Sequence, residues 1–298
     1  MRLRGIEKGM AVYLALSFAL AWAPTFLLRG LWQTSEQTLS TRLLLCSVAY
    51  AVTMGWQPLF AVLVVRRCVE DAEYLDAGLR AARGRFVLVA LSFAGLLCAC
   101  ASALSLMQAR FVLPAVVPAA MAPGASAALY ATFSAGTAIL FVWLQCLSEE
   151  IGWRGYFLSR AMQLFGPRRG LVLHGVAWGV WYAPIFLLTN GELAETAPRA
   201  GAFVLTCVLL GTVLGWLRLA SRSIVPPTIL NSLLTIAAGL PFLMQGIDVG
   251  LRGAVYAPAG WVPLLVLAFV LCATRFKHVI VTPRPPSILQ SSFGRTLH

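Results

Sequence analysis

The sequence predicts an all-α protein that crosses a membrane about eight times, with both termini in the cytoplasm. Of its 298 residues 59% are hydrophobic and only 11% are charged, whereas an average soluble domain is about 25% charged. Long apolar runs recur along the chain, and most are near the roughly 20 residues that a membrane helix needs. Helices are the expected form of each run, because a helix in lipid satisfies its own backbone groups.

The apolar runs give the candidate membrane helices in chain order. They are Ala11–Leu28, Leu43–Val65, Phe86–Gln108, Ser126–Leu147, Gly170–Thr189, Gly201–Leu217, Ile224–Gln245 and Gly260–Thr274. Residues 1–21 also resemble a signal peptide with a basic start and a cleavage-like Ala19-Leu20-Ala21. The apolar run continues to Leu28 without a polar break, which favours an uncleaved membrane anchor.

The net charge of +12 is distributed unevenly between the loops. Most of the basic residues lie in the two ends of the chain and in the segments 66–85, 148–169 and 218–223. The remaining ones are Arg29, Arg42, Arg110, Arg199 and Arg252. This alternation places both termini in the cytoplasm, since cytoplasmic loops carry the excess of Lys and Arg. The positive charge therefore predicts orientation in a lipid bilayer and no nucleic-acid partner.

The chain is expected to form one transmembrane domain over residues 1–281, followed by a flexible cytoplasmic tail at 282–298. The basic segment 66–85 also carries acids and is predicted to be a solvated cytoplasmic helix that can touch anionic lipid. No Walker loop or dinucleotide fingerprint is present. A transporter would favour inverted repeats and broken helices, and the sequence pattern shows neither.

Two adjacent glutamates, Glu149 and Glu150, stand out because the other acids lie in tails or outside the apolar runs. They follow the run 126–147 with no intervening Pro, so the same helix is expected to carry them. An ionisable group at membrane depth is costly and indicates a functional site.

The spacing of these residues predicts different roles for the two carboxylates. Neighbours on a helix point about 100° apart, and Glu150 can pair with Arg154 at i, i+4. Glu149 then faces elsewhere, without an obvious cation, and is suited to take a proton from water. The alternative is a buried Glu–Arg staple with a second Glu at the lipid headgroups. The residues alone favour neither.

The segment Glu149-Glu150-Ile-Gly-Trp-Arg154-Gly resembles the EExxxR motif of the CAAX protease and bacteriocin-processing (CPBP) family of intramembrane endopeptidases. The likeness covers roughly residues 140–237 and implies a CPBP-like core at about 126–245. Its further segments are Phe165-Gly-Pro-Arg-Arg, Trp178-Gly-Val-Trp-Tyr182-Ala-Pro184, Gly215-Trp-Leu-Arg-Leu and Ser223-Ile-Val-Pro226.

Members of this family are multi-helix proteins that cleave peptides near the cytosolic membrane face. Some remove the tripeptide after a prenylated Cys, and bacterial members process or protect against peptides. The resemblance therefore implies a peptide or membrane-protein substrate and a multi-pass protein of the bacterial inner membrane. The oligomeric state is left open.

By this resemblance Glu149 matches the glutamate that activates water, and Glu150 and Arg154 match the structural pair. The chain departs from the family at both histidine motifs. The FxxxH motif appears as Trp178 to Tyr182, with Tyr in place of His. The HxxxN motif, counted from the Ser-x-x-Pro anchor, falls on Asn231 and Thr235. In an alternative register Asn231 is the terminal Asn and Pro227 replaces the His.

These replacements change the expected chemistry. Tyr182 and Asn231 are predicted to converge on Glu149, where they can donate hydrogen bonds to a developing oxyanion. Trp178 and Thr235 are predicted to support the site. Two carboxylates without an imidazole make a poor zinc site, so no metal or other cofactor is expected.

His174 is the one histidine outside the C-terminal tail. It precedes Tyr182 by eight residues, about 12 Å along a helix, so it shares a face with Tyr182 but lies at another depth. A satisfied interhelical histidine is preferred over a histidine that replaces the missing motif residues. The small-residue pairs Gly175-x-x-x-Gly179 and Gly211-x-x-x-Gly215 predict close helix packing.

Two functions follow from these residues. The first is a divergent CPBP-type intramembrane endopeptidase with Glu149 as the base and Tyr182 and Asn231 as orienting groups. The second is a catalytically inactive homologue that binds peptides or partner membrane proteins, with Glu150 and Arg154 kept for structure. The loss of both motif histidines favours the second function, and the intact EExxxR motif is compatible with both.

Overall fold

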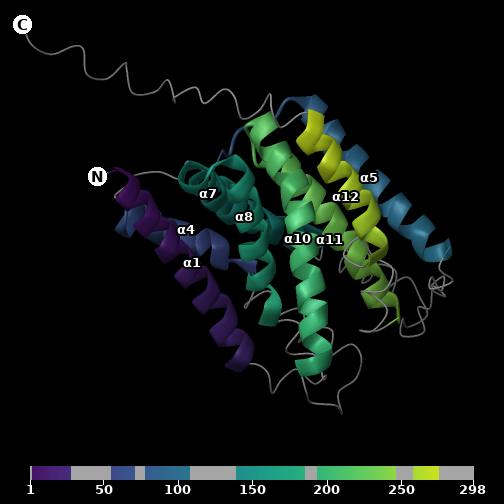
Figure 1. The fold of residues 1–298 in the computed structure, drawn as a ribbon, viewed down its shortest axis with the longest axis horizontal. Coiled ribbons are helices and arrows are strands. Elements are labelled where there is room, and N and C mark those ends of the chain that lie inside the picture. The colour runs from purple at the N-terminus through teal and green to yellow at the C-terminus, as the bar shows by residue number, and fades with distance from the viewer. Residues whose placement is uncertain are drawn as a thin grey trace, which may run out of the picture.

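The computed structural model describes residues 2–27, 55–70, 78–107, 139–184, 193–245 and 258–274. Every regular element within these ranges is a helix (Figure 1), which confirms the all-α class. The elements are α1 (Arg2–Leu27), α4 (Gln57–Cys68), α5 (Gly84–Met107), the π-helix η2 (Ile151–Phe157), α7 (Leu158–Phe165), α8 (Pro167–Trp181), α10 (Leu193–Ser221), α11 (Val225–Gln245) and α12 (Pro258–Thr274). Residues 139–150 are also helical and run directly into η2.

Several apolar helices among the described residues overlap the runs predicted to cross a membrane. They are the long helices Arg4–Leu27, Gly84–Ala101 and Ala197–Ser221 and the shorter helices Val225–Ala237 and Gly260–Thr274. The three long helices are sufficient to cross a membrane by length and composition. Some predicted segments lie outside the described residues. They include the first parts of the runs Leu43–Val65 and Ser126–Leu147 and the predicted tail 282–298.

The helices pack around α8 and α10, which lie side by side at the centre of the molecule (Figure 1). On one side α1 packs on α4 and on α8, and on the other side α11 and α12 pack on α10. The largest fully buried side chains include Trp153, Trp178 and Trp181, which come from η2 and α8. The interior is therefore filled by aromatic rings at the centre of the bundle.

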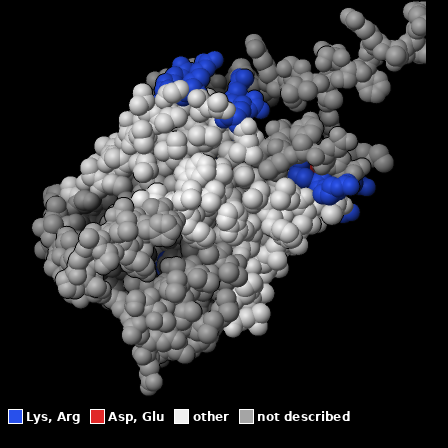
Figure 2. Space-filling model, turned by 180° about the vertical axis from the view of Figure 1, so that it is seen from behind, with Lys and Arg blue, Asp and Glu red and all other residues white. Residues whose placement is uncertain are grey.

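The outer surface is largely apolar. Large side chains such as Leu88, Phe269 and Val270 are exposed on α5 and α12. In Figure 2 the visible Lys and Arg side chains gather at the upper end and right-hand edge, and most of the described surface is uncharged. An apolar surface with basic residues gathered toward one end is the arrangement that a lipid bilayer requires.

The basic segment 66–85 is not the single helix predicted for it: its ends belong to α4 and α5, and residues 78–83 are not helical. Helix α4 ends at Cys68. Gly78 has φ +75°, a backbone conformation outside the right-handed helix. The carbonyl of Gly78 accepts a hydrogen bond from the amide of Ile224 at 3.1 Å. The segment is thus docked against the turn between α10 and α11.

The crossing of α8 and α10 depends on glycines, as the small-residue spacing predicts. A Cβ atom added to Gly175 would lie 2.5 Å from the Cα of Val208, and one added to Gly179 would lie 2.6 Å from the Cα of Val204. Both obstacles are backbone atoms of α10, which cannot rotate away. The two glycines therefore set how closely α8 approaches α10.

Gly175→Ala should lower the free energy of unfolding by about 1–3 kcal/mol, the usual cost of overpacking. Gly201→Ala on α10 is the matched control, since its Cβ would meet no described atom within 4 Å. The control should be neutral or stabilising by up to about 1 kcal/mol, because Ala favours a helix over Gly. Thermal unfolding of the two purified variants in detergent measures the difference, and equal midpoints would contradict the proposed crossing.

Candidate active site

The two glutamates lie at the end of the helical stretch 139–150, as predicted, and both are buried. The Oε1 atom of Glu149 accepts hydrogen bonds from the Tyr182 hydroxyl and from the Gln145 amide at 3.3 Å. Its Oε2 atom accepts one from the Trp178 indole N–H at 3.2 Å. These three donors are uncharged, so hydrogen bonds from neutral groups hold the Glu149 carboxylate.

Glu150 points to a different set of partners. Its Oε1 atom accepts hydrogen bonds from Arg154 Nη1 at 3.0 Å and from the Asn231 amide at 3.2 Å. The predicted Glu150–Arg154 ion pair is thus confirmed, and both of its side chains are fully buried. The Arg154 guanidinium also lies over the Trp178 ring, 3.8 Å from the centroid. Trp178 therefore connects the two carboxylates, since its N–H binds Glu149 and its ring face contacts the cation that pairs with Glu150.

The helix beyond the glutamates is a π-helix, which the sequence reasoning did not predict. η2 is buried along its whole length. Gly152 lies against α1 and α4, where an added Cβ would meet the Tyr13 hydroxyl at 2.6 Å and Pro58 Cβ at 2.5 Å. π-helical turns are rare and occur frequently at functional sites. The sequence feature that marks this segment is the pair of glycines, Gly152 and Gly155, on either side of Trp153 and Arg154.

Tyr182, the residue predicted to stand at the first motif histidine, lies directly after the last residue of α8. Its ring packs edge-on against Trp181, with centroids 4.8 Å apart. Trp181 is in turn held by α1, since its indole N–H donates to the Ser17 carbonyl at 2.9 Å and its own carbonyl accepts from Trp22 at 3.1 Å. Helix α1 thus fixes the end of α8 from which Tyr182 reaches Glu149.

Asn231 and Thr235 both come from α11. Tyr182 lies at Glu149 as predicted, whereas the Asn231 amide donates to the neighbouring carboxylate, Glu150. Thr235 lies beside Cys146, whose thiol donates to its hydroxyl oxygen at 3.8 Å. The start of α11 is capped by Ser223, whose hydroxyl oxygen accepts from the Val225 amide at 3.1 Å. The Ser-x-x-Pro anchor thus has a structural role in placing Asn231.

His174 is buried between α8 and α10, which agrees with its predicted interhelical position. Its ring packs against Trp178 and Trp153, each with centroids 6.4 Å away. Within the described residues neither ring nitrogen has a hydrogen-bond partner, so the predicted satisfied histidine is not observed there. Trp178 lies one helical turn closer to Tyr182 and occupies the position next to Glu149.

The side chains around the glutamates do not fit a zinc ion. Catalytic zinc sites use histidine, cysteine and carboxylate ligands, usually three from the protein. Both motif histidine positions carry other residues, and Tyr182 and Asn231 are each hydrogen-bonded to a carboxylate. In the described part of the chain no group of three His, Cys, Asp or Glu side chains could hold a metal ion.

Comparison with known proteins finds a similarity over the segment that contains this site. Residues 131–237 match the family model described as type II CAAX prenyl endopeptidase, Rce1-like. The chain is also 25% identical over 127 residues to CAAX prenyl protease 2 of Methanococcus maripaludis. That alignment covers 41% of this chain and 47% of the relative, so the chain spans about half the length of the curated relative it matches.

The matched segment contains both glutamates, Tyr182 and Asn231. Together with the apolar helices this match supports an integral membrane protein. Residues 131–237 are therefore similar to the Rce1-like type II CAAX prenyl endopeptidases, and both similarities agree with the resemblance to the CPBP family that the motifs indicate.

Proposed function

We propose that the chain is an intramembrane endopeptidase that hydrolyses peptide bonds near the cytosolic membrane face, with Glu149 as the water-activating base. The observation that carries this proposal is the Tyr182 hydroxyl donating to a buried Glu149 carboxylate. In this proposal Tyr182 takes the place of the first motif histidine and supplies a hydrogen-bond donor to the Glu149 carboxylate. General bases act within hydrogen-bond reach of the proton that they remove.

In this mechanism Glu149 takes a proton from water as the water oxygen attacks the carbonyl carbon of the scissile bond. The carbonyl oxygen becomes an oxyanion, to which Tyr182 and Asn231 turn their donors. The tetrahedral intermediate then collapses, the C–N bond breaks, and the protonated Glu149 gives its proton to the leaving amine. Glu150, Arg154 and Trp178 hold the base in place, and no metal takes part.

The remaining assignments belong to the same proposal. The chain crosses the membrane eight times with both termini in the cytoplasm, residues 1–281 form one domain with a CPBP-like core at 126–245, and 282–298 form a tail. The substrate is a peptide or a membrane protein, of which a prenylated C-terminal peptide is the first to test because the curated relative is named a CAAX prenyl protease. We place the chain in a bacterial cell membrane, although that relative is archaeal.

The second candidate is a catalytically inactive homologue that binds peptides or partner membrane proteins. Its support is that both residues at the histidine positions are already engaged, Tyr182 with Glu149 and Asn231 with Glu150. In this function Tyr182 and Asn231 stabilise the buried carboxylates of the fold, and the single proton of the Tyr182 hydroxyl is donated to Glu149 instead of to a substrate.

The test is cleavage by the purified chain in lipid vesicles of an internally quenched peptide that ends in S-farnesyl cysteine and three further residues. Wild type should release the tripeptide, and Glu149→Ala should not. If wild type is inert and the double variant Tyr182→His, Asn231→His gains activity, the native chain is not an endopeptidase. The inactive-homologue function fails if wild type cleaves and Glu149→Ala does not.

A further inference from the structure

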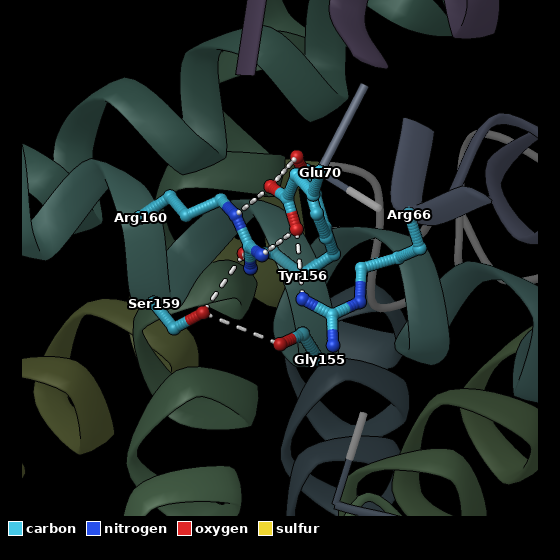
Figure 3. Close-up of polar contacts among 6 residues, drawn as sticks. All are labelled: Arg66, Glu70, Gly155, Tyr156, Ser159 and Arg160. Atoms are coloured by element: carbon cyan, nitrogen blue, oxygen red, sulfur yellow. Dashed lines mark hydrogen bonds and ion pairs between the residues drawn. The ribbon is translucent and has the colours of Figure 1, made fainter. Parts of the chain in front are cut away.

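A carboxylate outside the family-matched segment lies at the centre of a polar cluster (Figure 3). Glu70 follows the end of α4, and Arg160 of α7 binds it with two parallel hydrogen bonds, Nε to Oε1 at 3.0 Å and Nη2 to Oε2 at 2.7 Å. Arg66 adds a third, Nη1 to Oε2, at 2.7 Å. Bidentate Arg–carboxylate pairs are among the strong hydrogen bonds of proteins. We call Arg66, Glu70, Tyr156, Ser159 and Arg160 the Glu70 cluster.

The Glu70 cluster holds the C-terminal end of η2. The Tyr156 hydroxyl donates to Glu70 Oε1 at 2.7 Å, and the Arg160 guanidinium lies over the Tyr156 ring, 3.6 Å from its centroid. The Ser159 hydroxyl donates to the Tyr156 carbonyl at 2.8 Å. Helix α1 packs against the same contact. A Cβ atom added to Gly9 would lie 2.7 Å from Glu70 Oε1 and 2.7 Å from the Tyr156 hydroxyl oxygen.

The cluster is partly buried, and its charges favour an ionised Glu70. Burial raises the pKa of the Glu70 carboxyl, but the hydrogen bonds from Arg160, Tyr156 and Arg66 outweigh burial and hold that pKa below its ordinary value. Glu70 therefore stays charged at neutral pH, and one carboxylate connects α4, η2 and α7.

The conformation of η2 decides where Arg154 points. A π-helix closes i→i+5 hydrogen bonds, one residue more than the i→i+4 bonds of an α-helix. If η2 returned to α geometry, the chain beyond it would rotate by about 100°. Tyr156 would then leave Glu70, and Arg154 would turn relative to Glu150. Conversely, a fixed Tyr156 opposes that rotation.

We propose that Glu70 is a positioning residue that locks η2 in its π-helical form through Tyr156 and Arg160, and so keeps the Arg154–Glu150 pair and the adjacent Glu149 in catalytic register. The catalytic part of this inference rests on the proposed endopeptidase function. The contact of the Glu70 cluster with η2, which we call the clamp, lies at the end of η2 that is farther from the glutamates. It acts on the reaction only through the helix.

The experiment compares Glu70→Gln and Tyr156→Phe with the matched control Glu7→Gln, which changes an exposed carboxylate on α1. Full-length chains in lipid vesicles are assayed with the farnesylated quenched peptide. Amide hydrogen exchange of residues 151–157 is followed in the same preparations. Tyr156→Phe removes only the hydroxyl and keeps the ring under Arg160. It is therefore the milder variant, and it tests the contact even if Glu70→Gln fails to fold.

Glu70→Gln and Tyr156→Phe should each lower kcat about 10-fold or more with KM within about twofold, because small misplacements of catalytic groups cost up to about 100-fold. Exchange of residues 151–157 should accelerate about 10-fold. The double variant should be no worse than the stronger single variant, since both remove the same contact. Glu7→Gln should match wild type in both assays.

The two readouts separate this inference from the proposed function. If wild type cleaves and both variants keep its kcat, the positioning role is overturned and the endopeptidase stands. If wild type is inert and exchange of 151–157 still accelerates in both variants, the endopeptidase fails and the clamp on η2 is supported. Unchanged exchange in both variants overturns the clamp whatever the activity.

Discussion

Glu149→Gln should lower kcat by about 100- to 10,000-fold, the range that a positioned acid–base group contributes. Gln has nearly the shape of Glu, and its single amide oxygen can keep the hydrogen bond from Tyr182. The Trp178 N–H, which donates to the other carboxylate oxygen, loses its acceptor. The Gln side chain cannot accept a proton from water. The loss should therefore appear in kcat while KM stays close to wild type, as measured with the quenched peptide in vesicles.

The fold of this variant should be intact, because neutralising a fully buried carboxylate removes a desolvation cost. Its thermal midpoint in detergent should stay close to that of wild type, because the lost hydrogen bond from Trp178 offsets part of this gain. Cleavage by Glu149→Gln at the wild-type rate would show that another group activates water. A large fall in thermal midpoint would instead assign Glu149 to folding.

Arg154→Met should be the most destabilising single change at the site. Glu150 is fully buried, and without Arg154 the Asn231 amide is the hydrogen-bond donor that remains to it within the described residues. Breaking a buried ion pair from one side costs about 3–5 kcal/mol, and the contact of Arg154 with the Trp178 ring is lost as well. Denaturant unfolding of the purified protein in mixed micelles measures this loss.

The double variant Glu150→Gln, Arg154→Met should recover most of the lost stability, because it leaves no unpaired buried charge. Arg168→Met, at an exposed position in the first turn of α8, is the matched control and should change the free energy of unfolding by no more than about 0.5 kcal/mol. A single Arg154→Met variant as stable as this control would contradict the buried pair.

Local patterns in the sequence were sufficient for much of the fold and part of the site. The apolar runs located the helices, because burial in lipid demands such runs whatever the neighbouring helices are. The i, i+4 spacing predicted the Glu150–Arg154 pair, and the Gly-x-x-x-Gly spacing on α8 predicted its close approach to α10. Each of these features is a pattern along a single helix.

Contacts between distant segments were not predictable in the same way. Asn231 was expected at Glu149 and binds Glu150, a choice set by how α11 packs beside the helical stretch 139–150. The basic segment 66–85 was expected to be helical, yet its carbonyls bind the turn before α11. Glu70 looked like one of several solvated acids, because nothing near it in sequence shows that Arg160 and Tyr156 will surround it.

The sequence by itself thus determined that this is a helical membrane protein with two glutamates at the end of one helix, because composition, apolar length and helical spacing are local properties. Only the tertiary structure decided the partners of those glutamates, with Tyr182 on one carboxylate and Asn231 on the other. It also showed the π-helix and its anchoring by Glu70. A hydrogen bond between residues tens of positions apart depends on the packing of whole helices, which no single stretch of sequence specifies.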